Sequence, residues 1–214
     1  MTAAPDFVRG QTIVGTAPLV PELRLYLASE ITPIWQATEA WLATRCEPPF
    51  WAFAWPGGQA LARHVLDHAD CLIGKRVLDF ACGGGLAGLA AARAGAAHVL
   101  AADIDPMAIA ATRANAALNG LTLSVTGTDL VGAPPAWDVI LCGDVCYEAP
   151  MTRHILPWLR SLARGAEVWV ADPGRAYLPR AGLVPFAIYA VPTTLELEDR
   201  TERTVTLYRM LASD

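Results

Sequence analysis

One stretch, residues 76–86 with the sequence RVLDFACGGGL, most constrains how this chain can fold. Residues 77–80 form a largely apolar run that predicts a buried strand. Three glycines follow at 83–85, and the alanine-rich run after them predicts a helix. Glycines let the backbone approach a ligand closely, and the first N–H groups of a helix are free to bind one. A strand, a glycine turn and a helix in this order predict a nucleotide-type pocket in an α/β fold.

A second strand is predicted at residues 98–102, and Asp103 follows it. The spacing between the glycine turn and this strand is that of one strand–helix–strand unit. In such units an acid at the tip of the second strand holds the hydroxyls of a ribose. Both dinucleotide dehydrogenases and S-adenosylmethionine (SAM) methyltransferases place an acid there, so this residue alone leaves the two classes open.

The composition of the glycine turn separates them. Dehydrogenases need G-x-G-x-x-G, because a pyrophosphate lies on the helix N-terminus. Here the order is Asp79-x-Ala81-x-Gly83-x-Gly85, with alanine at the first glycine position. A carboxylate before the turn would repel a pyrophosphate but suits the ammonium and sulfonium groups of SAM. The pattern resembles the first motif of class I methyltransferases, and a turn without any ligand is the alternative.

Composition narrows the class of protein further. The chain has 214 residues, 54% of them hydrophobic and 17% charged, which is typical of one compact α/β domain. The net charge of −5 argues against nonspecific nucleic-acid binding, which depends on neutralising phosphates. No apolar run reaches the length of a membrane span, and residues 1–6 lack the features of a signal peptide, so we expect a cytoplasmic protein. The cysteines at 46, 71, 82, 142 and 146 form no C-x-x-C pair, which indicates free thiols and no metal site.

The N-terminal quarter is predicted to be helical. The first ten residues are expected to be loose, and Leu23, Leu27 and Ile34 contribute to a helical periodicity over residues 21–44. Thr32 and Pro33 fit the N-cap and first position of the second of two helices. We therefore expect one domain, with a helical extension over residues 1–50 that acts as a lid or flank and a SAM-binding catalytic core over 51–214.

An aromatic segment punctuated by Pro and Gly, residues 48–59, is predicted to be a structured loop before a helix at 59–68. Two interpretations stay open for it: a cover over the cofactor, or a hydrophobic plug under the N-terminal helices.

Acids recur at the ends of the predicted strands. Asp129 follows a short strand at 123–125, and Asp144 follows a buried strand at 137–142. In an open parallel sheet ligands bind at the carboxyl ends of the strands, so Asp79, Asp103, Asp129 and Asp144 are expected at one edge. A helix at 151–163, a fifth strand at 167–171 and two β-like runs at 183–189 and 204–210 complete the chain. This order predicts a three-layer, Rossmann-like sheet of seven strands, mostly parallel, with an antiparallel C-terminal strand.

With these residues assembled, the chain resembles class I, seven-β-strand methyltransferases with an Asp-x-x-Tyr motif after the fourth strand, here residues 144–147 (DVCY). Within that class it resembles the bacterial form of the lysine methyltransferases of the electron-transfer flavoprotein β-subunit. The stretches WPGGQAL at 55–61, DIDP at 103–106 and DPGR at 172–175 carry this narrower likeness. The resemblance covers about residues 50–175, and the chain ends are less diagnostic.

The resemblance implies a role for each matched residue. Asp79 with Ala81, Gly83 and Gly85 would hold the methionine part of SAM. Asp103 would bind the ribose hydroxyls, Ile104 would also contact the cofactor, Asp129 would contact the adenine, and Trp55 would line the pocket from above. Asp144 and Tyr147 would form the catalytic mouth for a lysine, with Glu148 and Arg175 as weaker candidates on the substrate side. The likeness also implies a protein substrate, and we expect a monomer that binds neither nucleic acid nor membrane.

The chemistry constrains how Asp144 could act. With a reference pKa of about 10.4, only about one lysine in 2,500 is neutral at pH 7. An apolar mouth with Trp and Tyr favours the neutral amine, whereas a carboxylate favours the cation. We therefore interpret Asp144 as an acceptor that orients the amine rather than as a strong base. The alternatives are methylation of a ribosomal protein or a small amine, an inactive SAM-binding module, and an NAD-dependent oxidoreductase.

Overall fold

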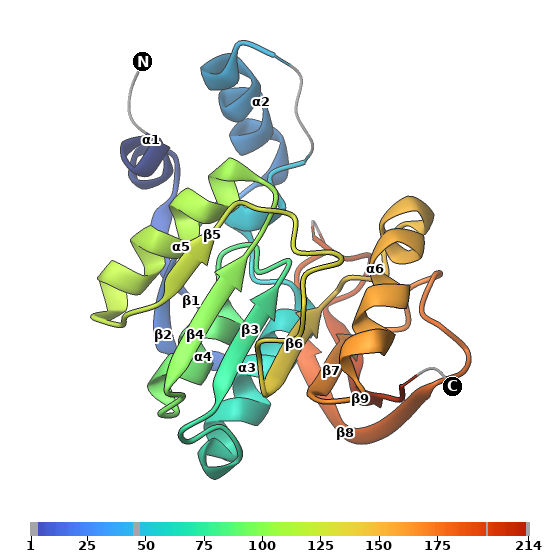
Figure 1. Cartoon of the computed structure of the whole chain (residues 1–214). Coiled ribbons are helices and arrows are strands. Elements are labelled where there is room, and N and C mark those ends of the chain that lie inside the picture. Colours follow the sequence, from blue (N-terminus) through green and yellow to red (C-terminus); the bar gives the residue numbers. More distant parts are fainter. Residues whose placement is uncertain (1–3, 45–47, 196, 213–214) are drawn as a thin grey trace.

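A computed structural model describes residues 4–44, 48–195 and 197–212. Seven strands form one sheet in the order β5-β4-β3-β6-β7-β9-β8 (Figure 1). The strands, in chain order, are β3 (Arg76–Phe80), β4 (His98–Ala102), β5 (Ser124–Thr126), β6 (Val139–Gly143), β7 (Glu167–Asp172), β8 (Leu183–Pro192) and β9 (Glu202–Met210). The strands from β5 to β7 pair in parallel, and β9 runs antiparallel to both β7 and β8. The predicted sheet, with its antiparallel C-terminal strand, is confirmed.

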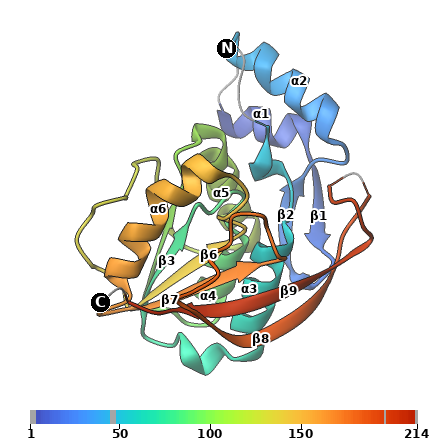
Figure 2. The ribbon, with the colours of Figure 1, turned by 90° about the vertical axis from the view of Figure 1, so that its right-hand side faces the viewer.

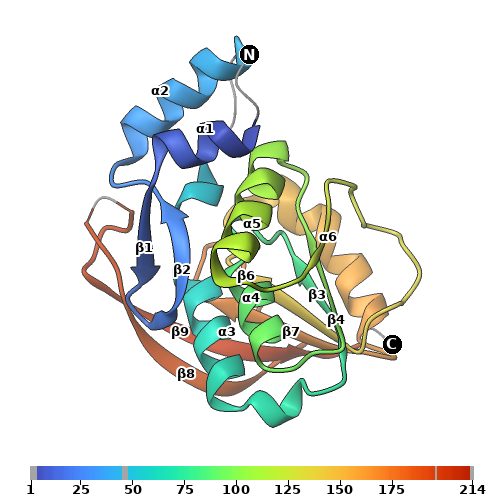
Figure 3. The same ribbon diagram turned by 90° about the vertical axis from the view of Figure 1, so that its left-hand side faces the viewer.

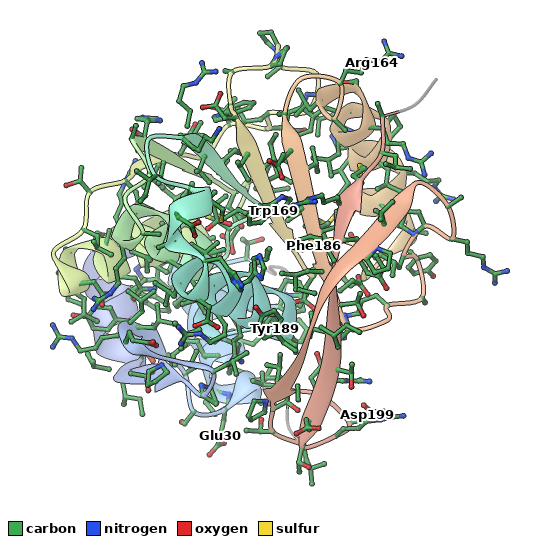
Figure 4. The ribbon with its side chains drawn as sticks, turned by 90° about the horizontal axis from the view of Figure 1, so that it is seen from below. Glu30, Arg164, Trp169, Phe186, Tyr189 and Asp199 are labelled. Atoms are coloured by element: carbon green, nitrogen blue, oxygen red, sulfur yellow. The ribbon has the colours of Figure 1, made fainter. Side chains whose placement is uncertain are left out.

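Helices cover both faces of this sheet and make three layers. The helices α3 (Pro56–Asp67), α4 (Leu86–Arg93) and α5 (Pro106–Asn119) lie on one face, and α6 (Ala149–Leu162) lies on the other (Figure 3). A hydrophobic core lies on each face of the sheet, because side chains alternate between the faces along each strand. In β3, Val77 packs with α3 and α4 on one face, and its neighbour Leu78 packs with α6 on the other. Trp169 of β7 and Phe186 of β8, 5.5 Å apart between ring centroids, extend the first core toward the C-terminal strands (Figure 4).

The N-terminal segment differs from the prediction of helices alone. Helix α1 (Ala4–Gln11) replaces the expected loose start, and a hairpin of β1 (Ile13–Ala17) and β2 (Val20–Leu27) stands where the first long helix was expected. Leu23 and Leu27 are four residues apart, as in a helix, but Leu25 between them is also buried, which is the period of a strand. Within the described residues 4–44, the expected helical extension is therefore a helix, a hairpin and a second helix.

Several helix boundaries also differ. Helix α2 (Ile31–Leu42) begins with Glu30 as its N-cap residue, so the prediction of Thr32 as cap and Pro33 as first residue is wrong. Pro33 still lies in the first turn, where its missing N–H costs nothing. Helix α3 begins at Pro56, three residues earlier than predicted, because proline fits the first helical position. Pro157 lies inside α6 without ending it, and short 3₁₀ turns occupy Phe50–Ala52 (η1) and Ala69–Cys71 (η2).

The described residues also show the state of the cysteines and whether they contain a candidate metal site or a membrane-spanning helix. Cys71, Cys82, Cys142 and Cys146 are free thiols, and Cys46 lies outside the described residues. Within the described ranges, no cluster of three or more His, Cys, Asp or Glu side chains could hold a metal ion. None of the helices described is long and apolar enough to cross a membrane.

Candidate active site

A cavity of about 800 Å³ opens at the carboxyl ends of the central strands, where the sequence places its candidate residues. Eleven of the predicted cofactor, catalytic and substrate-side residues line it: Trp55, Asp79, Ala81, Gly83, Asp103, Ile104, Asp129, Asp144, Tyr147, Glu148 and Arg175. Gly85 does not line the cavity. The prediction that four strand-end aspartates share one edge is confirmed.

The glycine turn between β3 and α4 has a left-handed backbone at three positions. Ala81, Gly83 and Gly85 have φ angles of 53°, 53° and 79°. Only glycine fits the last of these, because a Cβ at Gly85 would lie 2.6 Å from Cγ2 of Thr112 in α5. The Thr112 hydroxyl in turn donates to the carbonyl oxygen of Gly83 at 3.0 Å. Gly85 therefore acts on the cavity indirectly, by allowing the turn to pack against α5.

Asp79 lies at the floor of the cavity and is almost fully buried. Its Oδ2 accepts a hydrogen bond of 2.7 Å from the backbone N–H of Gly88 in α4. Burial, opposed by the hydrogen bond from Gly88 and assisted by the neighbouring carboxylate of Asp103, raises the pKa of Asp79 to about 7. An ionised Asp79 therefore gains from a cation in the cavity.

Asp103, at the end of β4, organises the turn from the opposite side. Its Oδ2 accepts from the N–H of Gly83 at 2.9 Å, and its Oδ1 accepts from the N–H of Asp105 at 3.0 Å. Burial raises its pKa above the ordinary range. Asp105 is the N-cap of α5 and accepts from the N–H of Met107 at 2.7 Å. Ile104, between the two acids, is 74% exposed at the cavity edge.

Asp129, after β5, is more open than the other acids. Its Oδ1 accepts from the N–H of Val131 at 3.0 Å, and its Oδ2 lies 3.0 Å from Nε2 of His154 in α6. These two hydrogen bonds lower the pKa of Asp129, so it is ionised at neutral pH. His154 also lines the cavity, and the sequence analysis did not identify it.

Asp144 is held in a strained backbone conformation at the end of β6, with a φ of 55°. Its Oδ2 accepts from the backbone N–H of Gly57, at the start of α3, and its Oδ1 accepts from Nη2 of Arg175 at 3.0 Å. Burial raises the pKa of Asp144 to about 6, while the Arg175 guanidinium opposes the shift. The carboxylate thus lies in the cavity wall with one strong partner on each oxygen.

The aromatic segment both lines the cavity and packs into the core beneath the N-terminal helices. Trp55 lines the cavity, and its Nε1 donates to the carbonyl oxygen of Phe50 at 2.8 Å. The Phe50 ring lies 5.4 Å from that of Tyr147, so the segment reaches across to the loop after β6. Trp51 instead is buried in a core shared with α1 and α5. Tyr147 is 40% exposed at the cavity rim.

Asn115 of α5 is a second residue that sequence reasoning missed. Its Nδ2 donates to the carbonyl oxygen of Gly84 at 2.8 Å, and its Oδ1 accepts from the N–H of Tyr26 in β2 at 2.8 Å. It therefore ties the glycine turn to the N-terminal hairpin. An asparagine within an alanine-rich helical run was the available signal, since asparagine is disfavoured inside helices without a specific partner.

The cavity thus offers a glycine turn, buried acids for polar or cationic groups, and an aromatic rim with a carboxylate in the wall. Its volume and mixed lining suit a small-molecule site at the carboxyl edge of a parallel sheet. The buried carboxylates and the close backbone of the turn fit the charged amino acid and ribose portions of a molecule such as SAM.

Comparisons with known proteins place this geometry in a family. The model of the ribosomal protein L11 methyltransferase (PrmA) family matches residues 60–143. A solved structure of magnesium protoporphyrin IX methyltransferase from Synechocystis PCC 6803 with bound S-adenosylhomocysteine shares the fold, with a TM-score of 0.53, 19% identity, and coverage of 72% of this chain and 83% of that one.

Two curated relatives are much closer in sequence. The electron transfer flavoprotein beta subunit lysine methyltransferase of Xenopus laevis is 41% identical over 82% of this chain and 72% of its own length. The protein of the same name from Danio rerio is 36% identical over 87% of this chain and 75% of its own length. The chain therefore belongs to the electron transfer flavoprotein β-subunit lysine methyltransferase family, a family of SAM-dependent class I methyltransferases.

Proposed function

We propose that this protein transfers a methyl group from SAM to a lysine side chain of the electron transfer flavoprotein β-subunit. The observation that carries the proposal is the identity of 36–41% to relatives named for that reaction, over most of both chains. The cavity supports it, because the residues that match the family's motifs come together around one pocket. Action as a monomer in the cytoplasm, on protein rather than nucleic acid or membrane, is part of the same proposal.

The proposed roles follow the lining of the cavity. SAM supplies a methyl group on a positively charged sulfur. Asp79 and the glycine turn would hold its amino acid part, Asp103 with Ile104 its ribose, and Asp129 its adenine. Trp55 would cover the cofactor. These assignments use residues that line the cavity or shape the turn.

Asp144 and Tyr147 would handle the lysine. Tyr147, together with Phe50, gives the rim an apolar surface that favours the neutral amine by excluding water. The carboxylate of Asp144 would accept a hydrogen bond from the amine and hold its lone pair in line with the methyl group. Positioning of this kind supplies a large part of the rate enhancement when two reactants must be aligned.

A direct test is mass spectrometry of the purified flavoprotein β-subunit after incubation with the enzyme and SAM. We expect a gain of one or more methyl groups on lysine, and a far slower gain with the Asp144→Asn variant. The match to the L11 methyltransferase model over residues 60–143 favours ribosomal protein L11 as the second candidate. An L11 sample in the same assay separates them: modification of L11 alone would refute the proposed substrate.

A further inference from the structure

A buried glutamate outside the matched motifs reaches the proposed lysine site through one arginine. Glu198 belongs to the connection between β8 and β9, and only 5% of it is exposed. This connection lies at the far end of the β8–β9 hairpin, beside the β1–β2 hairpin (Figure 2), and Figure 4 labels Asp199 there. A small cavity lined by Ala17, Thr194 and Glu198 confirms that the two hairpins meet.

Glu198 binds Arg175 through two hydrogen bonds. Nη2 of Arg175 lies 2.5 Å from Oε1 of Glu198, and Nη1 lies 3.2 Å from Oε2. Arg203 also donates to Oε2, at 3.0 Å from its Nε. A paired fork of this kind fixes the plane of a guanidinium as well as its position. The orientation of Arg175 is therefore set by Glu198.

The same arginine makes only one hydrogen bond to Asp144. Nη2 of Arg175 gives one hydrogen to Oδ1 of Asp144 and the other to Glu198. Without the Glu198 carboxylate, the guanidinium could turn its two-pronged edge onto Asp144, which is its other buried acidic partner. Oδ2 of Asp144, which already accepts from the N–H of Gly57, would then also accept from Arg175, and the position open to an incoming amine would be filled.

We propose that Glu198 is a positioning residue for methyl transfer: by holding Arg175 in a fork, it restricts that arginine to one bond with Asp144 and leaves the carboxylate able to accept the incoming amine. The inference rests on the proposed function, since it assigns Asp144 to the amine. It adds the β8–β9 connection to the parts of the chain that act on the site.

The charged and polar groups around Asp144 determine how the pKa of Asp144 should respond to the loss of Glu198. They come from the end of β7, from the β8–β9 connection, from the start of α3 and from the segment of Asp144 itself. At and after the end of β7 these groups are Asp172 and Arg175, and in the β8–β9 hairpin they are Glu198 and Arg203. The start of α3 contributes the N–H of Gly57, and the segment of Asp144 contributes the thiol of Cys146, whose pKa burial raises to about 12. Removing the negative charge of Glu198 leaves more of the positive charge of Arg175 uncompensated beside Asp144, so the Asp144 carboxyl should titrate at lower pH.

The test compares Glu198→Gln with a matched substitution elsewhere. Arg63 is likewise shared by two acids, Glu22 at 2.7 Å and Asp67 at 2.8 Å, away from the cavity, so Glu22→Gln makes the same charge change in a similar bridge. The Asp144 carboxyl is titrated by ¹³C NMR in each protein with S-adenosylhomocysteine added. We expect its midpoint to fall by about half a pH unit or more in Glu198→Gln and to stay in place in Glu22→Gln.

Methylation of the β-subunit is measured on the same proteins. We expect kcat to fall about tenfold or more in Glu198→Gln, with the dissociation constant for SAM within about twofold of wild type, and Glu198→Asp to recover part of the loss. An unmoved midpoint, an unchanged kcat, or an equal loss of SAM binding would each overturn the proposal. A wild-type enzyme inactive on the β-subunit would refute the proposed substrate instead, and the titration would still decide whether Glu198 controls Asp144.

Discussion

The carboxylate of Asp144 accepts a hydrogen bond from the backbone N–H of Gly57, which fastens the end of β6 to the first turn of α3. No side chain could stand at Gly57, because a Cβ there would lie 2.5 Å from Oδ2 of Asp144 and 2.6 Å from the carbonyl oxygen of Ala171. Asp144 therefore has a structural task beside its proposed chemical one, and substitutions must separate the two.

The Asp144→Asn variant separates them. It keeps the size of the side chain and one of its two acceptor bonds but removes the charge that would orient the amine. We expect kcat for methylation to fall about 100-fold or more because the amine is no longer aligned. The free energy of unfolding should fall by about 1–3 kcal/mol because one buried partner is left unpaired. Calorimetry should show SAM binding within about threefold of wild type, since no cofactor contact is assigned to Asp144.

Asp138, at the opposite end of β6 from Asp144, provides a control for this variant. Asp138 pairs with Arg76 at 2.9 Å on the surface, so Asp138→Asn removes a charge without touching the cavity. Its kcat should match that of wild type. If Asp144→Asn lost SAM affinity as severely as turnover, the carboxylate would belong to the cofactor site and our assignment would be wrong.

Gly85 offers a test of how the turn controls cofactor binding from outside the cavity. Gly85→Ala should cost about 1–3 kcal/mol of stability for a side chain at positive φ, and it also forces a Cβ against Thr112. We expect at least about a tenfold weaker binding of SAM, because the displaced Thr112 also holds the carbonyl of Gly83. Calorimetry and thermal unfolding measure the two effects.

Gly120→Ala is the matched control, since Gly120 has a φ of 65° but open space around it. It should lower the melting temperature and leave SAM affinity unchanged. Adding Thr112→Ser to Gly85→Ala removes the methyl group that clashes and should restore part of the affinity. Equal SAM affinities for the two alanine variants would show that the packing of the turn does not matter.

The sequence predicted those features of the site that depend on position along a strand. Four aspartates at the carboxyl ends of four strands were assigned to one edge because parallel strands end together, and all four line the cavity. The partners of these acids lie far away in the chain: Asp144 binds Gly57 and Arg175, 87 and 31 residues distant. No local pattern encodes such pairs, so the fork between Arg175 and Glu198 could be found only in three dimensions.

The N-terminal segment shows a different limit. In residues 20–27, leucines at 23, 25 and 27 satisfy the strand period, while the pair 23 and 27 also satisfies the helical one. The choice was decided by tertiary contacts: Leu23 and Leu25 are buried in the core with α3 and α4, and Asn115 binds the backbone of Tyr26. The hydrophobic periodicity of so few residues contains no information about contacts with a helix some 90 residues later in the chain.

The raised pKa of Asp79 makes both stability and cofactor binding depend on pH. The pKa is about 7 in the fold against 3.8 for the free group, so the folded state binds more protons than the unfolded one between these values. The free energy of unfolding contributed by Asp79 is therefore highest below pH 3.8 and is lost as the pH rises to about 7. If Asp79 holds the amino group of SAM, binding should release a proton, and SAM affinity should rise from about pH 6 to about pH 8.

Calorimetry at several pH values in two buffers checks this expectation. Asp79→Asn should bind SAM weakly with little pH dependence, and its melting temperature should exceed that of wild type more at high pH than at low pH. Asp129→Asn is the comparison, because the pKa of Asp129 is lowered and the group stays ionised over this range. It should weaken binding but keep the pH slope. A slope that survives in Asp79→Asn would assign the released proton to another group.

Tyr147 tests whether the rim recognises the protein substrate rather than the cofactor. Its ring is 40% exposed and lies 5.4 Å from Phe50, so Tyr147→Ala removes half of an aromatic contact at the entrance. We expect kcat/KM for the β-subunit to fall about tenfold or more, with SAM affinity unchanged, and Tyr147→Phe to retain most of the activity because the ring supplies the apolar surface. Tyr177, 47% exposed and outside the cavity lining, provides the control: Tyr177→Ala should behave as wild type. A Tyr147→Phe variant as impaired as Tyr147→Ala would show that the hydroxyl group, not the ring, handles the lysine.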